Sequence, residues 1–107
     1  MAEKIVKVGT SEEIPPGYGK VMQAGGRLIA LFNIDGSFFA IDNDCPHRGG
    51  PLAEGSLQGT VVSCPWHLWR YDVTSGACLS NPFGHVQSYP VRVSDGHVWV
   101  TIPGAGL

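Results

Sequence analysis

Apolar residues occur along most of the chain in short runs, which alternate with polar residues or end at turn-forming pairs. Residues 4–8 alternate charged and apolar side chains, a pattern typical of a half-buried strand. A glycine pair at 25–26 and Asp35-Gly36 predict two hairpin turns between the next apolar runs. Three further strands are therefore predicted at residues 18–23, 27–34 and 37–41. The second of these is apolar on both faces, so we expect both faces to be buried.

The second half of the chain continues the pattern of short strands and turns. Short strands are predicted at residues 61–63 and 69–72, and residues 86–93 and 97–102 predict a final hairpin. One helical turn is expected at residues 10–14, and no long helical period is present. Many short strands with regular turns are typical of an antiparallel sandwich or barrel. We expect one all-β domain over residues 1–107, with a small subdomain at about 43–72.

Composition narrows the classes of partner. A chain of 107 residues is long enough for one domain, and its net charge of −2 predicts neither a nucleic-acid partner nor an anionic membrane surface. No apolar stretch resembles a leader or a membrane span, so we expect a soluble, cytoplasmic protein with no membrane partner. Three cysteines are an odd number, which suits a reducing compartment.

Two loops each combine one cysteine with one histidine, namely Cys45 with His47 and Cys64 with His67. A proline follows each cysteine, which fixes φ and removes one backbone donor beside the sulfur. Two soft sulfurs and two imidazoles predict a metal site. Zinc accepts such a set, although zinc fingers usually pair like ligands along the chain. The mixed order suits a two-iron cluster in which cysteines hold one iron and histidines the other.

The two loops carry a family resemblance. Cys-Pro-His-Arg-Gly-Gly-Pro-Leu at 45–52 and Cys-Pro-Trp-His-Leu-Trp-Arg-Tyr-Asp at 64–72 resemble the cluster loops of Rieske 2Fe–2S proteins. The resemblance covers the whole chain and implies an antiparallel Rieske-type sandwich or barrel with one 2Fe–2S cluster. It implies that Cys45 and Cys64 bind a buried inner iron, and that His47 and His67 bind an outer iron near solvent.

Departures from the family pattern indicate a low reduction potential. High-potential Rieske proteins carry an extra cysteine in each loop, and the two form a disulfide; here Gly50 and Trp66 occupy those places. Trp69 stands where those proteins have a serine that donates to a bridging sulfur. Fewer hydrogen bonds to sulfur lower the potential. Tyr71, however, matches a tyrosine whose hydroxyl donates to a ligand sulfur in high-potential members. The chain resembles the Rieske-type ferredoxins of bacterial oxygenase systems.

A docking surface is expected around the two histidines. The segment at Pro82 resembles the proline loop that covers the cluster in this family. The loops offer mostly apolar side chains with one charge, which suits a small and transient contact. The expected docking residues are Pro46, Arg48, Leu68 and Phe83.

The resemblance implies a soluble, monomeric one-electron carrier that is not a catalyst by itself. It would accept electrons from an NAD(P)H-dependent flavin reductase and pass them to a terminal oxygenase that acts on aromatic compounds. Two alternatives remain. One is the small Rieske subunit of an assimilatory nitrite reductase, and the other is a zinc-stabilised interaction module.

Overall fold

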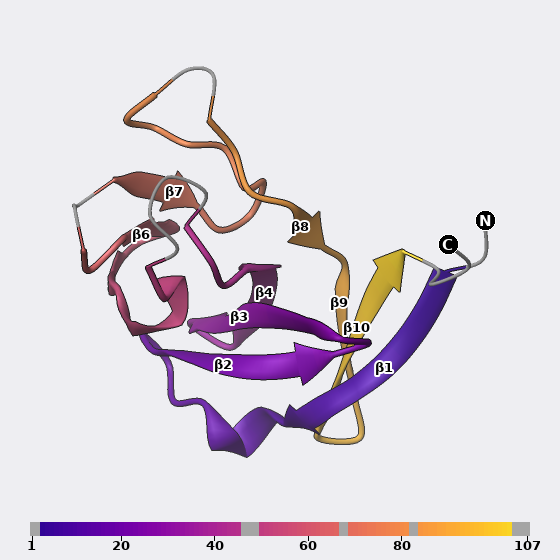
Figure 1. The fold of residues 1–107 in the computed structure, drawn as a ribbon. Coiled ribbons are helices and arrows are strands. Elements are labelled where there is room, and N and C mark those ends of the chain that lie inside the picture. The colour runs from indigo at the N-terminus through magenta and orange to yellow at the C-terminus, as the bar shows by residue number, and fades with distance from the viewer. Residues whose placement is uncertain (1–2, 46–49, 67–68, 82–83, 104–107) are drawn as a thin grey trace.

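The computed structural model describes residues 3–45, 50–66, 69–81 and 84–103 (Figure 1). These residues form antiparallel strands and two short 3₁₀ turns, η1 at Ser11–Glu13 and η2 at Leu52–Glu54. The prediction of an all-β, antiparallel fold is confirmed. Neither helical turn in the described ranges has the length or the apolar character that crossing a bilayer requires.

The strands of the described ranges form three sheets (Figure 1). The central sheet has four strands in the order β2 (Gly19–Ala24), β3 (Arg27–Ile34), β4 (Ser37–Asp42) and β8 (Ser88–Tyr89). The second has three strands in the order β1 (Glu3–Thr10), β10 (His97–Pro103) and β9 (Val91–Ser94). The third, at the opposite end from the termini, has the order β5 (Ser56–Gln58), β6 (Val61–Ser63) and β7 (Arg70–Asp72).

Strand β3 contributes to both hydrophobic clusters that the described residues form. Ile29 and Leu31 belong to the cluster shared with β1 and β10, whereas Ala30 and Phe32 belong to the cluster that contains Cys45 and the third sheet. Successive side chains of a strand point to opposite faces, so this one strand covers two cores. The prediction that both faces of this segment are buried is confirmed for these residues.

The prediction of one strand over residues 86–93 is wrong. The segment divides at Pro90 into β8, which pairs with β4, and β9, which pairs with β10 in the other sheet. Proline has no N–H to donate and therefore does not continue a ladder, but its carbonyl oxygen still accepts from the Thr101 N–H at 3.0 Å. This change of sheet links the central sheet to the second one. Strand β5 was also missed, because its single apolar residue, Leu57, lies beside the turn at residues 59–60.

Candidate metal centre

Backbone hydrogen bonds close both cysteine loops at the cysteine. Cys45 lies three residues beyond β4, and its N–H donates to the Gly50 carbonyl at 2.9 Å. Cys64 directly follows β6, and its N–H donates to the Trp69 carbonyl at 2.7 Å. Both sulfurs are buried in one hydrophobic cluster. The fold therefore holds the two predicted cysteine ligands at the bases of two tight loops.

Asn43 closes the neck of the first loop. It is 5% exposed, its carbonyl accepts from the Leu52 N–H at 2.7 Å, and its side-chain Oδ1 accepts from the Ala53 N–H at 3.0 Å. Its own N–H donates to the Leu28 carbonyl at 3.1 Å. One residue thus ties the loop to β3 on one side and to η2 on the other. Asn43 leaves no signal in the sequence, because its partners come from other parts of the chain.

A polar network supports the same neck one residue earlier. The Tyr89 hydroxyl donates to the Asp42 carboxylate at 2.5 Å, and the Arg27 guanidinium donates to the Tyr89 oxygen at 3.1 Å. Burial first, and the Asp42 carboxylate second, raise the pKa of Tyr89 to about 12. Asp42 also accepts from the Gln87 N–H at 3.0 Å. This network joins β3, β4 and β8 where the loop begins.

Tyr71 lies against the first cysteine. Its hydroxyl oxygen is 3.2 Å from the Cys45 sulfur, and the whole side chain is buried. Burial raises the pKa of Tyr71 well above its usual range, and the neighbouring Cys45 sulfur raises it further. The phenol therefore keeps its proton and is available as a hydrogen-bond donor to sulfur. The sequence left the direction of this hydroxyl open, and the structure turns it toward Cys45 rather than toward water.

Gly50 and Trp66 face each other across the site. A Cβ atom at Gly50 would lie 2.7 Å from the Cys64 sulfur and 3.2 Å from the Trp66 ring, so no larger side chain fits without displacement. Trp66 is 63% exposed, whereas Trp69 packs partly buried against the cluster that contains both cysteines. The places where a disulfide joins the loops in high-potential relatives thus lie in contact here, without cysteines.

The remaining predicted site residues lie outside the described ranges. These are His47 and His67 among the ligands, Pro82 of the covering segment, and Pro46, Arg48, Leu68 and Phe83 of the docking surface. Within the described ranges no three histidine, cysteine or acidic side chains gather in a way that would hold a metal. Those ranges contain only the cysteine half of the predicted ligand set.

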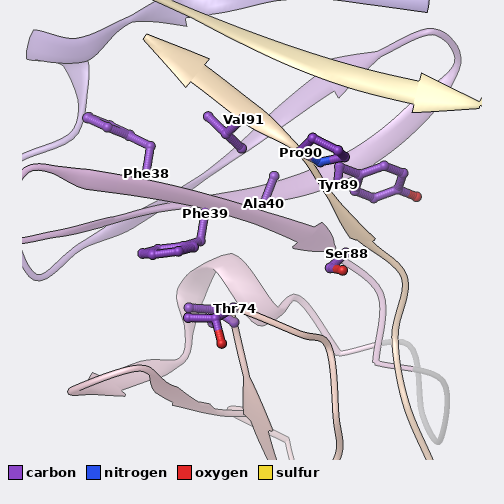
Figure 2. A pocket seen from close by; sticks show the side chains of 9 residues that line it. Phe38, Phe39, Ala40, Thr74, Ser88, Tyr89, Pro90 and Val91 are labelled. Carbon is purple, nitrogen blue, oxygen red and sulfur yellow. The ribbon is translucent and has the colours of Figure 1, made fainter. Parts of the chain in front are cut away.

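A separate pocket lies where β4, β8 and β9 meet the turn at Thr74 (Figure 2). Its volume is about 460 Å³, and Phe38, Phe39 and Val91 line it together with Tyr89. None of the predicted ligand, tuning or docking residues is among its described lining. The pocket is therefore distinct from the cysteine loops.

Comparison with known families agrees with this geometry. The model of the Rieske [2Fe-2S] domain matches residues 4–90, which include both loops and Tyr71. The chain belongs to the Rieske [2Fe-2S] domain family. The cofactor is therefore one Rieske-type 2Fe–2S cluster, and the zinc alternative is not supported.

Relatives and solved structures add detail. The ferredoxin component of a naphthalene 1,2-dioxygenase system from Pseudomonas aeruginosa is 31% identical over 103 residues, which cover 95% of this chain and 99% of that one. The ferredoxin in a complex of reduced oxygenase and oxidized ferredoxin of carbazole 1,9a-dioxygenase has a TM-score of 0.81 at 28% identity, covering 90% and 91% of the two chains. A putative NADH-dependent nitrite reductase small subunit from Mycobacterium tuberculosis has a TM-score of 0.90 at 26% identity, covering 98% and 100%.

The described residues fit the cysteine side of such a cluster. The two buried sulfurs lie in one hydrophobic cluster. The Tyr71 hydroxyl contacts the Cys45 sulfur, and Gly50 lies so close to the Cys64 sulfur that a larger side chain has no room there. Thiolate is the form of cysteine that binds iron, and a hydrogen bond to thiolate stabilises its negative charge. The site therefore has the ligand type, the burial and the hydrogen bonding that an iron–sulfur centre needs.

Proposed function

We propose that this protein is a one-electron carrier whose cluster is bound by Cys45, Cys64, His47 and His67. The two buried cysteines at the bases of paired loops, in a chain of the Rieske family, are the observation that carries this proposal. The cluster supplies one reversible electron step when it is bound. We assign no catalytic residue, since the chain's own groups bind, bury and tune the cluster.

The proposed partners are a flavin-dependent reductase as electron donor and a terminal oxygenase as acceptor. Relatives that match almost the whole chain are named as ferredoxin components of aromatic dioxygenase systems, and one solved relative is titled as a complex of ferredoxin with its oxygenase. We propose that the electron leaves on the histidine side, through a docking surface at Arg48, Leu68 and Phe83. We further propose a monomer of one domain over residues 1–107, with a cluster-binding subdomain at about 43–72. With Cys45 and Cys64 as ligands, Cys78 has no partner for a disulfide, which suits the reducing cytoplasm.

Metal and sulfide analysis tests the cofactor and its ligands. We expect about two irons and two acid-labile sulfides per chain in anaerobically purified protein. The reduced protein should give a Rieske-type EPR signal, with an average g value below that of all-cysteine clusters. Changing His47 or His67 to cysteine should move the spectrum toward the all-cysteine type. Stoichiometric zinc without iron would refute the proposal.

A reconstituted electron-transfer chain tests the role. Oxygenase turnover that requires NAD(P)H, the reductase and this protein together supports the carrier function. The matched control is protein in which Cys64→Ser removes one proposed ligand, and it should support no turnover. Failure of the fully loaded protein to accelerate any oxygenase with its reductase would contradict the carrier role while leaving the cluster assignment intact.

A nitrite reductase small subunit is the second candidate function. It is favoured by one observation, the TM-score of 0.90 with a putative small subunit of that enzyme over nearly the full length of both chains. Such a subunit would co-purify with a large sirohaem protein. A free carrier would instead be isolated alone, so affinity purification from the native host distinguishes the two functions.

A further inference from the structure

The outer face of the second sheet carries a tryptophan between two cations. Val98 and Val100 of β10 are buried in the core, so Trp99, which lies between them, points to the opposite face. Trp99 is directly opposite Lys7 of β1 and Arg92 of β9. Directly opposite residues share a face, with Cβ atoms about 4.5–5.5 Å apart. The row Lys7–Trp99–Arg92 therefore crosses this three-stranded sheet on its outer face.

A hollow of about 320 Å³ lies on this face, and its described lining consists of Ile5, Arg92, Ser94 and Trp99. Sites for small molecules are concave, mostly apolar and about 300–1,000 Å³ in volume, with a few polar groups that fix the orientation of the ligand. Here Ile5 and the indole supply the apolar surface, while the guanidinium and the Ser94 hydroxyl supply the polar groups. The composition of this outer hollow therefore suits a small molecule.

The charges around the outer hollow favour an anion. Arg92 lines the hollow, and Lys7 lies on the other side of the tryptophan. Among the described residues, neither of these cations has an ion-pair partner, so both charges are available to a ligand. The strands of this sheet contain one acidic residue, Glu3, and Asp95 lies in the β9–β10 turn. Neither carboxylate belongs to the described lining.

We propose that the outer hollow binds a small aromatic carboxylate, with the ring against Trp99 and the carboxylate on Arg92. Aromatic rings stack on indole with a gain beyond the apolar area they bury, and a guanidinium holds a carboxylate through two parallel hydrogen bonds. A phosphate or sulfate ion would leave the apolar surface unfilled, and a neutral aromatic molecule would leave the guanidinium unpaired.

This site is separate from the proposed cluster site. Its residues Arg92, Ser94 and Trp99 lie after residues 4–90, which match the family model. The third sheet, which leads into Cys64, lies at the opposite end from the termini, where β1 begins and β10 ends (Figure 1). The inference therefore goes beyond the electron-carrier function and does not depend on it.

Nuclear magnetic resonance of the tryptophan side chains tests the site in the cluster-loaded protein. The chain has three tryptophans, and Trp66 and Trp69 belong to the second cysteine loop, so they serve as internal references. Benzoate, the probe, should shift the Trp99 indole N–H signal saturably without shifting the other two or changing the EPR spectrum. Trp99→Phe identifies the signal. Benzamide keeps the ring without the charge and acetate keeps the charge without the ring, so each should bind roughly tenfold more weakly or worse.

Two matched substitutions test the charge that holds the ligand. Arg92→Gln removes an exposed guanidinium and should weaken benzoate binding roughly tenfold, since it removes a charge-assisted hydrogen bond. Arg70→Gln is the control, because Arg70 is also exposed but belongs to β7 of the third sheet, and it should leave the Kd unchanged. The proposal is overturned by the lack of a saturable shift with benzoate, by equal affinity for benzamide, or by an unchanged Kd in Arg92→Gln. A Trp99 shift caused by the reductase or the oxygenase but not by benzoate would overturn it too, and would assign this face to a protein partner.

Discussion

At the scale of single residues, contact between the two loops depends on the small size of Gly50. Its Cα lies so close to the Cys64 sulfur that a Cβ would be at 2.7 Å, and the Trp66 ring lies alongside. High-potential relatives hold these loops together by a disulfide at the two places that Gly50 and Trp66 occupy. Here packing of the tryptophan on the glycine backbone replaces the covalent link. The site is therefore held by noncovalent contacts and by the loop-closing hydrogen bonds.

The Tyr71 hydroxyl, 3.2 Å from the Cys45 sulfur, is a residue-scale feature that should raise the reduction potential. Without the serine donor and the disulfide, we expect a value at the low end of the Rieske range, roughly −150 to 0 mV. One net hydrogen bond is worth about 0.5–1.5 kcal/mol, and for one electron about 59 mV corresponds to 1.4 kcal/mol. The upper limit on the decrease in reduction potential caused by Tyr71→Phe is therefore roughly 20–65 mV.

Voltammetry at neutral pH checks this prediction, and Tyr18→Phe is the matched control. Tyr18 is 64% exposed and lies just before β2, so its hydroxyl should not affect the cluster. A potential in Tyr71→Phe equal to or above wild type would show that the hydroxyl does not favour the reduced cluster. A wild-type value above about +150 mV would contradict the assignment to the low-potential ferredoxins.

At the scale of secondary-structure elements, the Asn43 side chain is one of the groups that hold the neck of the first loop. In Asn43→Ala, the Ala53 N–H loses its acceptor in a buried position, which costs about 1–3 kcal/mol. We expect faster loss of the cluster, measured as bleaching of the visible absorbance, because the loop that carries Cys45 then opens more readily.

Asn33 offers a matched control for this prediction. It is also 5% exposed, donates to the Ile14 carbonyl at 2.7 Å, and accepts from the Gly36 N–H at 2.8 Å at the β3–β4 turn. Asn33→Ala should lower thermal stability by a comparable amount without a specific effect on cluster loss. If the ratio of the bleaching rate to the unfolding rate is the same in Asn43→Ala and Asn33→Ala, Asn43 has no special role at the loop.

The local signals at the turns explain why much of the fold was predictable. Asp35 and Asp95 adopt φ values of 52° and 54°, and each is followed by a glycine with positive φ, so the dipeptides specify hairpin turns by themselves. Strand β3 begins and ends at the predicted residues, because it lies between the positive-φ glycines at 25–26 and Asp35-Gly36. The division at Pro90 was not predicted, since the apolar alternation continues across it and only the pairing reveals the change of sheet.

The part of the site that forms a sequence motif was predictable. The four proposed ligands come from the spacing of cysteine and histidine in two loops. Asn43 was not identified as a site residue, because its role arises from partners that the fold brings together. Asn43 meets Ala53 through closure of the loop. Residues that position a site without binding its cofactor leave little signal in one sequence.

At the scale of the whole molecule, one hydrophobic cluster contains the two cysteines of the site and the other supports the fold. The cluster of β1, β9 and β10 against the central sheet contains neither Cys45 nor Cys64, whereas the other cluster contains both. The third sheet, whose strand β6 leads directly into Cys64, lies at the end of the molecule away from the termini (Figure 1). Electron transfer to a partner is therefore expected to occur at this end alone.

Leu79 is an exposed apolar side chain among the described residues, and we expect it to contribute to the docking surface. It directly follows Cys78, it is 50% exposed, and its N–H donates to the Arg70 carbonyl of β7 at 2.8 Å. Full burial of a leucine contributes about 1.5–3 kcal/mol, so partial burial in a complex contributes about 1 kcal/mol. Leu79→Ser should then slow second-order electron transfer to the oxygenase roughly fivefold, since 1.4 kcal/mol corresponds to tenfold.

Measuring both the cluster spectrum and the electron-transfer rate of each variant distinguishes an effect on docking from an effect on the cluster itself. Leu79→Ser and Arg48→Glu should leave the EPR spectrum unchanged while stopped-flow rates of electron transfer fall. Ile5→Ser is the matched control, because Ile5 is 65% exposed and belongs to β1, whose N-terminal end lies opposite the third sheet (Figure 1). Electrostatic attraction is screened by salt, so the Arg48→Glu defect should shrink at high ionic strength, whereas the Leu79→Ser defect should persist. Equal rates in all three variants and wild type, with both the reductase and the oxygenase, would place the dock elsewhere on the molecule.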